Sequence, residues 1–284
     1  MRDIVSSLRS QLFAWSKLQG VSFQYATMLY MQEGVLSRIA DSSFADTFIL
    51  KGGFLLFSIF RHTGRTTRDL DLLGKNISNN PKILEASFQS ILDKKQDDGL
   101  FFDTKSIQIN PIVEGAEYQG LRLHVVCFFG TVRNRLQIDI GFGDALSQGP
   151  VRIPFKRILG RGEFEVLSYP LSAVVAEKFE TLIALDAVNS RMKDLFDIAL
   201  ILNRFTISDQ ELKKAFAATF KQRGTNLPDN PAIFSEFYDR SPTLQEFWKG
   251  FLRRSQLGDA NLNSIIDIIQ RRLKPIYESL KNEI

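Results

Sequence analysis

Two aspartates one residue apart, downstream of a lysine and a glycine pair, constrain the fold of this chain most strongly. The lysine and glycines are Lys51, Gly52 and Gly53, and the aspartates are Asp69 and Asp71. The alternation of polar and apolar residues over 69–73 is typical of a β-strand, in which side chains at i and i+2 point to one face. The two carboxylates are therefore expected side by side, an arrangement that suits Mg²⁺ bound together with a polyphosphate.

The residues around the glycine pair predict a strand, a tight turn and a helix. An apolar strand is expected at 48–50 and a buried helix at 54–60, and this order offers backbone N–H groups to phosphate oxygens. The loop that follows carries Arg65, Thr67 and Arg68, and arginine can hold phosphate bidentately. The alternative is a tight turn with solvated arginines. The spacing matches neither a Walker A loop nor a dinucleotide fingerprint.

A third carboxylate, Asp139, stands among apolar residues in the alternating segment 136–140. Two aspartates on one strand face and a third on a neighbouring strand can hold divalent ions that clamp the attacking and leaving oxygens of a phosphoryl-type transfer. The alternative for Asp69 and Asp71 is a set of ordinary surface salt bridges with nearby arginines.

A second group of charged residues lies in the helical C-terminal part of the chain. Lys178 begins a helical stripe, and Asp194 and Asp197 share a face of the next helix because they are three residues apart. A lysine directed into a cleft could neutralise phosphate charge in the transition state. The alternative, which spacing alone favours, is an interhelical salt bridge of Lys178 with Asp194 or Asp197.

The chain divides into a mixed N-terminal part and a helical C-terminal part. Helices are predicted at 2–19, 23–40 and 81–95, and strands at 105–113, 121–129 and 133–142. A break near 150–168, rich in Gly, Pro and Arg, predicts the domain boundary. Beyond it the apolar spacing predicts six helices, at 171–188, 192–203, 208–222, 231–239, 242–255 and 260–280.

Composition excludes several classes of site. The single cysteine, Cys127, rules out an internal disulfide, and with only His62 and His124 beside it the chain also lacks the ligands of a Cys₄ or Cys₂His₂ zinc site. The net charge of +4 permits an anionic partner but lacks the basic excess of a dedicated DNA-binding module. No apolar run is long enough to span a membrane, and the N-terminus lacks a signal-peptide pattern. A cytoplasmic protein that does not contact membranes is expected.

The order of these motifs resembles the AbiEii/AbiGii family, the nucleotidyltransferase toxins of bacterial abortive-infection toxin–antitoxin systems. The resemblance is carried by Lys-Gly-Gly, Arg-x-Thr-x-Asp-x-Asp, the isolated strand Asp, Glu-Lys and Arg-x-Lys-Asp-x-x-Asp, in segments 50–73, 136–144 and 169–202. It implies an α+β fold: a DNA polymerase β-like nucleotidyltransferase core, a small mixed or antiparallel sheet flanked by helices. Residues 1–165 would form this core, and 166–284 a helical domain that completes the nucleotide site.

The resemblance also implies roles for individual residues. Asp69 and Asp71 match the paired metal-binding aspartates, and Asp139 a third metal ligand or the base for the acceptor hydroxyl. Lys178 matches the lysine that contacts the triphosphate, and Asp194 an essential acidic residue. The broader superfamily has Gly-Ser where this chain has Gly52-Gly53, which leaves phosphate binding there to backbone N–H groups. The implied nucleotide-binding set is Lys51, Gly52, Gly53, Arg65, Thr67, Arg68, Lys178 and Lys193.

The implied activity is Mg²⁺-dependent transfer of NMP from an NTP to an acceptor hydroxyl, with two metal ions and release of pyrophosphate. Some relatives add nucleotides to the 3′ end of tRNA, so tRNA is the expected acceptor. A cognate antitoxin is the expected partner, in a system for phage defence. Two alternatives stay open: nucleotidylation of a protein side chain, and a non-catalytic module that binds a nucleotide or the antitoxin.

Overall fold

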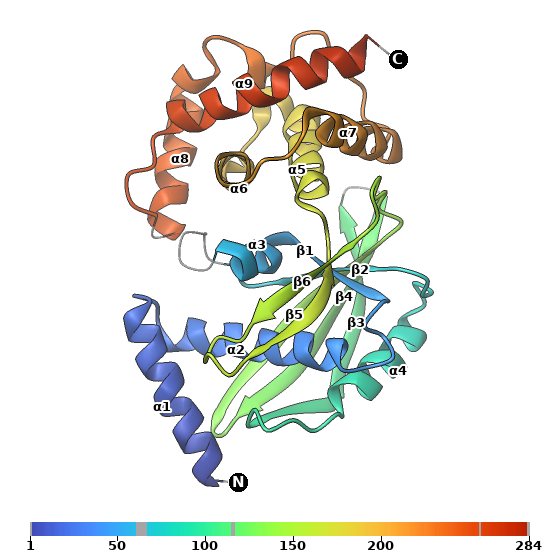
Figure 1. The fold of residues 1–284 in the computed structure, drawn as a ribbon, viewed down its shortest axis with the longest axis vertical. Coiled ribbons are helices and arrows are strands. Elements are labelled where there is room, and N and C mark those ends of the chain that lie inside the picture. Colours follow the sequence, from blue (N-terminus) through green and yellow to red (C-terminus); the bar gives the residue numbers. More distant parts are fainter. Residues whose placement is uncertain (1, 61–66, 115–116, 256, 283–284) are drawn as a thin grey trace. The chain divides into compact units, whose positions relative to one another are not determined.

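The computed structural model describes residues 2–60, 67–114, 117–255 and 257–282 (Figure 1). These residues form two compact units. The first contains residues 2–60, 67–114, 117–143 and 151–168, and the second contains residues 144–150, 169–255 and 257–282.

A mixed sheet forms the centre of the first unit. Among the described residues it has seven strands in the order β3-β4-β5-β2-β1-β7-β6. β2 runs parallel to β5, and β1 parallel to β7, whereas the other neighbouring pairs are antiparallel. The strands are β1 Phe48–Lys51, β2 Leu70–Gly74, β3 Leu100–Glu114, β4 Glu117–Phe129, β5 Val132–Phe142, β6 Val151–Lys156 and β7 Glu163–Ser168.

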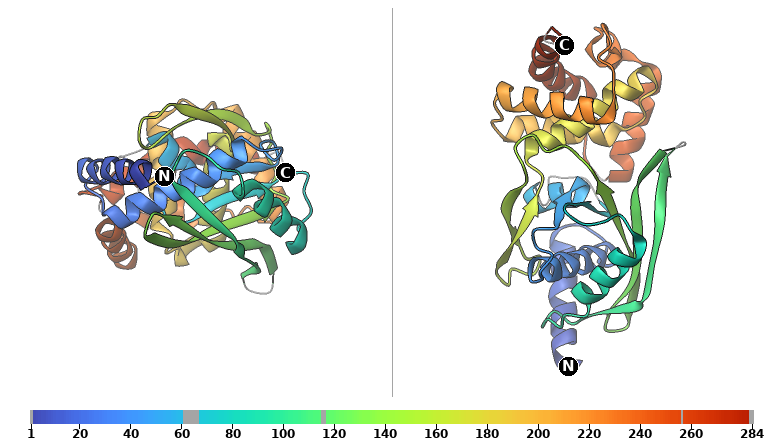
Figure 2. Two further views of the ribbon diagram at one scale, coloured as in Figure 1. Left: turned by 90° about the horizontal axis from the view of Figure 1, so that it is seen from below. Right: turned by 90° about the vertical axis from the view of Figure 1, so that its right-hand side faces the viewer.

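Helix α2, Phe23–Ala40, is the central helix of this unit. Its N-terminus is capped by Ser22, whose hydroxyl accepts a hydrogen bond from the Tyr25 N–H, and most of its residues are buried. The outer strands β3–β4 and β6–β7 lie on opposite sides of α2 (Figure 2). The other helices of the unit are α1 Arg2–Leu18, α3 Gly52–Phe60 and α4 Pro81–Leu92.

Helix α2 buries polar side chains as well as apolar ones. Arg38, which is 1% exposed, donates two hydrogen bonds to the Asp98 carboxylate, at 2.6 and 3.1 Å. Its Nε donates to the Lys94 carbonyl at 2.9 Å, and its guanidinium lies over the Phe102 ring. On the opposite side, buried Glu33 accepts from the Ile158 N–H at 2.6 Å. Because buried charges are tolerated only when paired, these contacts fix the segments on both sides of α2.

The predicted α+β class is confirmed, and two segments differ locally from what the sequence indicated. Segment 150–168, predicted as the domain boundary, contains the antiparallel pair β6–β7, and the first unit ends after it at residue 168. Pro154 is tolerated there because β6 is an edge strand of the sheet. The predicted helix at 231–239 is two 3₁₀ turns, Ala232–Phe234 and Tyr238–Arg240. The buried residues Ile233 and Tyr238 are five apart, a spacing that matches no α-helical face.

The second unit is a bundle of helices around an aromatic centre. The Phe179 ring lies 4.9 Å from that of Phe216 and 6.1 Å from that of Tyr277. Helix α9 presents a buried stripe at helical spacing. No helix in the described ranges is both long and apolar enough to cross a membrane. The elements are α5 Leu171–Leu185, η2 Asp186–Val188, α6 Met192–Arg204, α7 Asp209–Arg223, η3 Ala232–Phe234, η4 Tyr238–Arg240, α8 Pro242–Ser255 and α9 Leu262–Lys281.

Removal of the Arg38 guanidinium tests how far the first unit depends on α2. Arg38→Ala leaves the Asp98 carboxylate buried without its partner, and we expect the free energy of unfolding to fall by about 3–5 kcal/mol. Arg271→Ala is the control, because Arg271 forms an exposed i,i+4 pair with Asp267, and we expect a change within about 0.5 kcal/mol. Urea unfolding of both variants makes the measurement. Similar losses of unfolding free energy in the two variants would show that the buried Arg38–Asp98 pair stabilises the fold no more than an exposed pair.

Candidate active site

Four charged residues form one row across the sheet of the first unit. Lys51 on β1 lies opposite Asp71 on β2, Asp71 lies opposite Asp139 on β5, and Asp139 lies opposite Arg122 on β4. Directly opposed residues share a face of a sheet, so the row places two carboxylates between two cations. The sequence predicted that Asp71 and Asp139 come from neighbouring strands, and the strand pairing agrees with it.

Arg122 and Gln137 hold the Asp139 carboxylate. The Arg122 Nε and Nη2 donate to Asp139 Oδ1 and Oδ2 at 2.8 and 2.7 Å, a bidentate pair. Gln137, two residues earlier on the same face of β5, donates to the same two oxygens at 3.2 and 3.1 Å. Both oxygens therefore have protein partners, and a metal ion that used Asp139 would compete with Arg122.

The glycine pair lies against the Asp71 carboxylate. Gly52 has a φ of +64°, and a Cβ at this position would meet Asp71 Oδ2 at 2.0 Å. The Gly53 N–H donates a hydrogen bond to Asp71. The turn was expected to offer its N–H groups to phosphate; in this structure one of them holds the aspartate. Glycine is required at 52 because both the backbone angle and the close approach exclude a side chain.

Several charges act on the Asp71 carboxylate. Burial raises its pKa, and the carboxylates of Asp139 and Asp69 raise it further, whereas Lys51 and the Gly53 N–H lower it. All three carboxylates also raise the pKa of Arg122, chiefly through the hydrogen bonds to Asp139. The three aspartates therefore share one electrostatic environment in which negative charge is in excess of its local compensation.

The segment before β2 sets the position of Asp69. Asp69 is exposed and lies just before the strand, which begins at Leu70, so the predicted strand 69–73 is shifted by one residue. The Thr67 N–H donates to the Tyr25 hydroxyl at 2.9 Å, and Gln32 donates to the Arg68 carbonyl at 2.7 Å. Both partners are on α2, so the central helix holds the backbone that leads to Asp69.

The remaining predicted residues of the first unit have varied surroundings. Thr67 is buried and its hydroxyl donates to the Asp69 carbonyl at 3.4 Å, which is a local turn contact. The Arg68 side chain is exposed, and Lys51 is half-buried. Arg65 lies outside the described residues. Across the described ranges, no three His, Cys, Asp or Glu side chains are arranged so that they could hold a metal ion.

The predicted residues of the second unit form a buried ion cluster. Lys178 Nζ lies 2.7 Å from Asp194 Oδ1 and 2.8 Å from Asp197 Oδ2, and Arg191 Nε donates to Asp194 Oδ2 at 2.6 Å. Asp194 and Asp197 are each 1% exposed, whereas Lys193 is exposed at the surface. Two cations and two carboxylates balance, which is the geometry of the interhelical salt bridge that spacing alone favoured.

The ionisation of Asp194 is stabilised by this cluster. Burial acts to raise the pKa of Asp194, but Lys178 and Arg191 outweigh it through charge and hydrogen bonds and lower the pKa to about 2. Asn189, which is buried, accepts from the Arg191 N–H at 2.9 Å and so fixes the turn before α6. Asp194 therefore stays a carboxylate over the neutral pH range.

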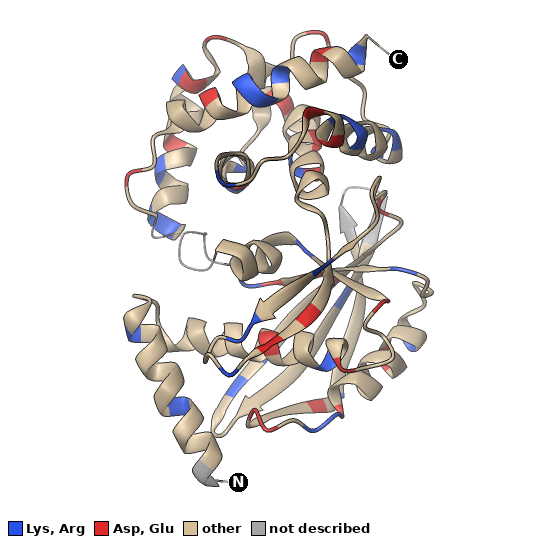
Figure 3. Ribbon diagram, viewed as in Figure 1, with Lys and Arg blue, Asp and Glu red and all other residues tan. Residues whose placement is uncertain are grey.

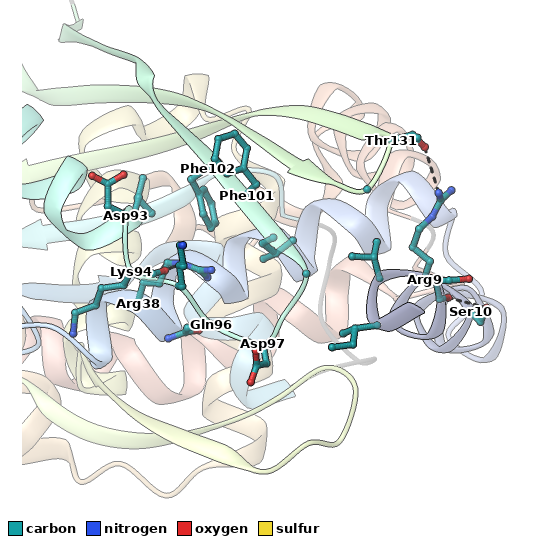
Figure 4. Close-up of a pocket in the computed structure, with 18 of the residues that line it drawn as sticks. Arg9, Ser10, Arg38, Asp93, Lys94, Gln96, Asp97, Phe101, Phe102 and Thr131 are labelled. Atoms are coloured by element: carbon teal, nitrogen blue, oxygen red, sulfur yellow. Dashed lines mark hydrogen bonds between the residues drawn. The ribbon is translucent and has the colours of Figure 1, made fainter. Parts of the chain in front are cut away.

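A large groove in the first unit lies among other residues. It has a volume of about 1540 Å³ and is lined by α1, the segment 92–102 and the turn at 130–131 (Figure 4). None of the predicted site residues lines it. Arg9 donates to the Thr131 hydroxyl at its rim, and the Arg38 guanidinium in its wall is paired with Asp98. Both arginines are thus used in structural contacts, and the aspartate row remains the candidate catalytic centre.

Comparison with known protein families shows the family to which the chain belongs. A family model described as "Nucleotidyl transferase AbiEii toxin, Type IV TA system" matches residues 34–270. The chain belongs to the AbiEii family. The match spans the elements from α2 to α9 and includes every predicted site residue of both units. AbiEii proteins are nucleotidyltransferases and act as toxins of type IV toxin–antitoxin systems, so the resemblance inferred from the motifs is confirmed.

Solved structures of similar fold cover nearly the whole chain. JHP933 from Helicobacter pylori has a TM-score of 0.54 at 14% identity, with 92% of this chain and 95% of that chain covered. A candidate nucleotidyltransferase from H. pylori has a TM-score of 0.51 at 15% identity, with 93% and 99% covered. No curated protein gives a significant match. At such identities the likeness shows the fold, and the nucleotidyltransferase-like fold prediction is confirmed.

Sequence reasoning missed Arg122, Gln137 and Gln32, the residues that hold the aspartates or their backbone. Arg122 and Gln137 could have been found, because each is a polar residue in an alternating strand whose register with Asp139 follows from the hairpin β4–β5. Gln32 gives no such signal. It lies inside a helix whose residues are buried nearly all round, and its contact partner is a backbone carbonyl.

Substitution of Gly52 tests the contact between the turn and Asp71. Gly52→Ala forces a Cβ into the carboxylate and strains a positive φ, so we expect a loss of stability larger than the roughly 1–2 kcal/mol of backbone strain alone. Gly160→Ala is a matched control, because Gly160 has a φ of +67° and open space around its Cβ position. Urea unfolding compares the two. Equal losses would contradict the close approach of Gly52 to Asp71.

The lowered pKa of Asp194 predicts a pH-dependent stability. Because the folded pKa of about 2 is below the ordinary aspartate value of 3.8, this carboxylate adds stability above pH 4 that is lost as pH falls toward 2. We expect a contribution of roughly 2 kcal/mol near neutral pH, reduced to roughly half near pH 3. The measurement is the difference in unfolding free energy between wild type and Asp194→Asn as a function of pH. A difference that is constant across this range would contradict the assignment.

Proposed function

We propose that this protein transfers NMP from an NTP to a hydroxyl of RNA, with the 3′ end of tRNA as acceptor, in a reaction that requires Mg²⁺. In this reaction the acceptor oxygen attacks the α-phosphorus, the bond to the β-phosphate oxygen breaks, and pyrophosphate leaves. The observation that carries the proposal is the row in which Asp71 and Asp139 stand on adjacent strands, with Asp69 beside them and glycines against Asp71.

The aspartate group fits a divalent cation. Its donors are carboxylate oxygens, which hard cations prefer, and the mutual effect of the three charges on the Asp71 pKa would be relieved by a bound cation. Mg²⁺ usually takes one or two protein carboxylates and completes its shell with phosphates and water. Asp69 and Asp71 would hold the first ion, and Asp139 would contribute to a second. The metal supplies charge neutralisation at the reacting phosphate.

The chain's own groups perform the remaining tasks in this proposal. Lys51, Arg65 and Arg68 neutralise phosphate charge, and Gly52 and Gly53 let the backbone approach the nucleotide. Asp139, oriented by Arg122 and Gln137, takes the proton of the acceptor hydroxyl or ligates the metal. The family resemblance adds Lys178 as a triphosphate contact, with Asp194 as the carboxylate that holds it. Lys193 and Thr67 complete the proposed nucleotide-binding set.

A cognate antitoxin is the partner that a type IV toxin implies, and we propose phage defence as the setting in which the pair acts. The aspartate site itself does not identify the base of the NTP, since its described groups are carboxylates and cations that contact phosphate and metal. Nucleotide preference therefore has to be measured with each NTP in turn.

Loss of one metal-binding aspartate is expected to abolish transfer. We expect Asp69→Asn and Asp71→Asn to lower incorporation of label from an α-³²P-NTP into RNA by roughly a hundredfold or more, because catalysis of this kind consists largely of positioning and charge stabilisation. Asp46→Asn is the matched control: Asp46 is an exposed aspartate of the same unit that pairs with Arg152 at the surface. We expect the control to keep wild-type activity.

Three results would contradict the proposal. An Asp69→Asn variant that transfers nucleotide at the wild-type rate would contradict the assignment of Asp69 as a metal ligand. Circular dichroism and urea unfolding check that this variant is folded. Label found on protein instead of RNA would show that the acceptor is a protein side chain. Tight NTP binding without turnover by the wild type, with every NTP and total RNA supplied, would indicate a binding module.

A further inference from the structure

One face of strands β3, β4 and β5 is open to solvent in the first unit. On the face toward α2, the alternate residues from Leu121 to Phe129 on β4 and from Leu136 to Ile140 on β5 are buried to 2% exposure or less. The opposite face carries polar, charged and aromatic side chains that are exposed or half-buried, apart from Val126. We call it the open sheet face; its described members are Phe101, Asp103, Gln108, Asn110, Arg122, His124, Val126, Phe128, Arg133, Arg135, Gln137 and Asp139.

The strand register places these residues in successive rows that lead to the aspartates. Phe101, Phe128 and Arg133 form the row farthest from the aspartates, and Arg135 belongs to the next row. The last row ends at Asp139, opposite Asp71. From Phe128 to Arg122 the strand advances six residues, which corresponds to about 20 Å. A stacked nucleic-acid strand advances about 3.4 Å per nucleotide, so the face is long enough for several nucleotides.

The open sheet face has an excess of positive charge beyond the aspartate row. Arg122 is balanced by Asp139, but Arg133 and Arg135 are exposed, and the only other carboxylate among the described members is Asp103. Arg135 donates to Gln108 at 2.7 Å, which holds its guanidinium over the sheet. The pKa of His124 is lowered by burial and then by Arg135 and Arg122, as expected in a positive field.

Aromatic rings stand at the end of the face that lies away from the aspartates. Phe101 is 64% exposed, and its ring lies 6.0 Å from that of Phe128, tilted by 35°. An exposed phenylalanine on an edge strand gains nothing from folding, whereas bases of a single strand stack on such rings. Exposed aromatic rings beside arginines are the combination that binds unpaired nucleotides.

The combination of charge and aromatic rings favours a nucleic-acid strand over a protein or a lipid surface. An apolar protein partner would not require Arg133 and Arg135, and a lipid surface would not require a row of residues that ends at a catalytic carboxylate. In the second unit, by contrast, α7, α8 and α9 all carry acidic as well as basic residues (Figure 3).

We propose that the open sheet face binds the 3′-terminal strand of the acceptor RNA. Arg133 and Arg135 contact its phosphates, the Phe101–Phe128 pair stacks against an unpaired base, and the strand runs toward Asp139 so that its terminal hydroxyl reaches the aspartates. The inference rests on the proposed function, since it names the surface that presents the acceptor to that site. It assigns a role to residues that none of the sequence motifs contains.

RNA binding by charge-neutralised variants tests the proposal directly. The probe is a fluorescein-labelled RNA hairpin with a single-stranded 3′ tail, and binding is followed by anisotropy without NTP at several salt concentrations. For Arg133→Gln/Arg135→Gln we expect weaker binding and a slope of log K against log salt that is smaller by roughly 1.4, the value for two contacts to a single strand. Lys75→Gln/Lys82→Gln removes the same charge from two exposed lysines of the same unit and is the control.

Substitution of Phe101 tests the proposed stacking of an unpaired base. We expect Phe101→Ala to weaken binding of the tailed hairpin by about fivefold or more, with a smaller effect on a blunt hairpin that has no unpaired base. Phe237→Ala is matched to it, because Phe237 is also 64% exposed but lies in the second unit. The control variant is expected to bind both hairpins as the wild type does.

The outcomes separate this inference from the proposed function. Equal RNA affinity and equal salt slope for the Arg133→Gln/Arg135→Gln variant and the wild type would overturn the inference and leave the aspartate site untouched. Equal loss in the lysine control would also overturn it, because the effect would then be one of net charge. The wild type could bind RNA through Arg133 and Arg135 and yet transfer no nucleotide. That result would support the inference and contradict the proposed function. A wild type that binds no RNA would overturn the inference.

Discussion

The buried polar side of α2 is the constraint on which the first unit depends. A helix buried on nearly all sides usually presents apolar residues, yet this one carries Gln32, Glu33 and Arg38 into the interior. Each must find a partner, because an unpaired buried charge costs several kcal/mol. Arg38 donates to the Asp98 carboxylate, and Gln32 donates to the Arg68 carbonyl. Glu33 accepts a hydrogen bond from the Ile158 N–H. The same requirement that stabilises the helix thus fixes three loops around it.

One of those loops is the segment that leads to Asp69, so the stability of the unit and the geometry of its site are linked. The aspartate row is itself unfavourable, because burial and the neighbouring carboxylates of Asp139 and Asp69 all raise the pKa of Asp71. Lys51 on one side and Arg122 on the other partly compensate this charge. The sheet keeps Asp71 and Asp139 on adjacent strands in spite of their repulsion, and we propose that a bound cation relieves it. Sites that bind metal and phosphate commonly carry such destabilising charge.

The sequence predicted the chemistry of this site better than its packing. Alternation alone predicted that Asp71 and Asp139 each lie in a strand, because a period of two is set by local backbone geometry, whereas their adjacency was expected from the needs of a metal site. Arg122 was not found, since its pairing with Asp139 depends on the register of a hairpin, and the Gly53 N–H was expected to face phosphate instead of Asp71.

In the second unit the spacing of Lys178, Asp194 and Asp197 predicted their contact correctly. Whether that cluster also contacts a nucleotide cannot be derived from spacing, because an ion pair and a phosphate contact use the same charges. The strands at 150–168 were missed for a different reason: the Gly, Pro and Arg that indicate a break are also tolerated in an edge strand. Edge and interior strands are distinguished only once the whole sheet order is known.

The central claim is that the aspartates of the first unit form a cation site, and direct metal binding tests it. Titration of Mn²⁺ into the wild type without nucleotide, followed by electron paramagnetic resonance, reports the affinity of the site independently of turnover. We predict that the wild type binds Mn²⁺ and that Asp71→Asn weakens the affinity by about tenfold or more, since it removes a ligand charge. Unchanged Mn²⁺ affinity in a folded Asp71→Asn variant would contradict the account.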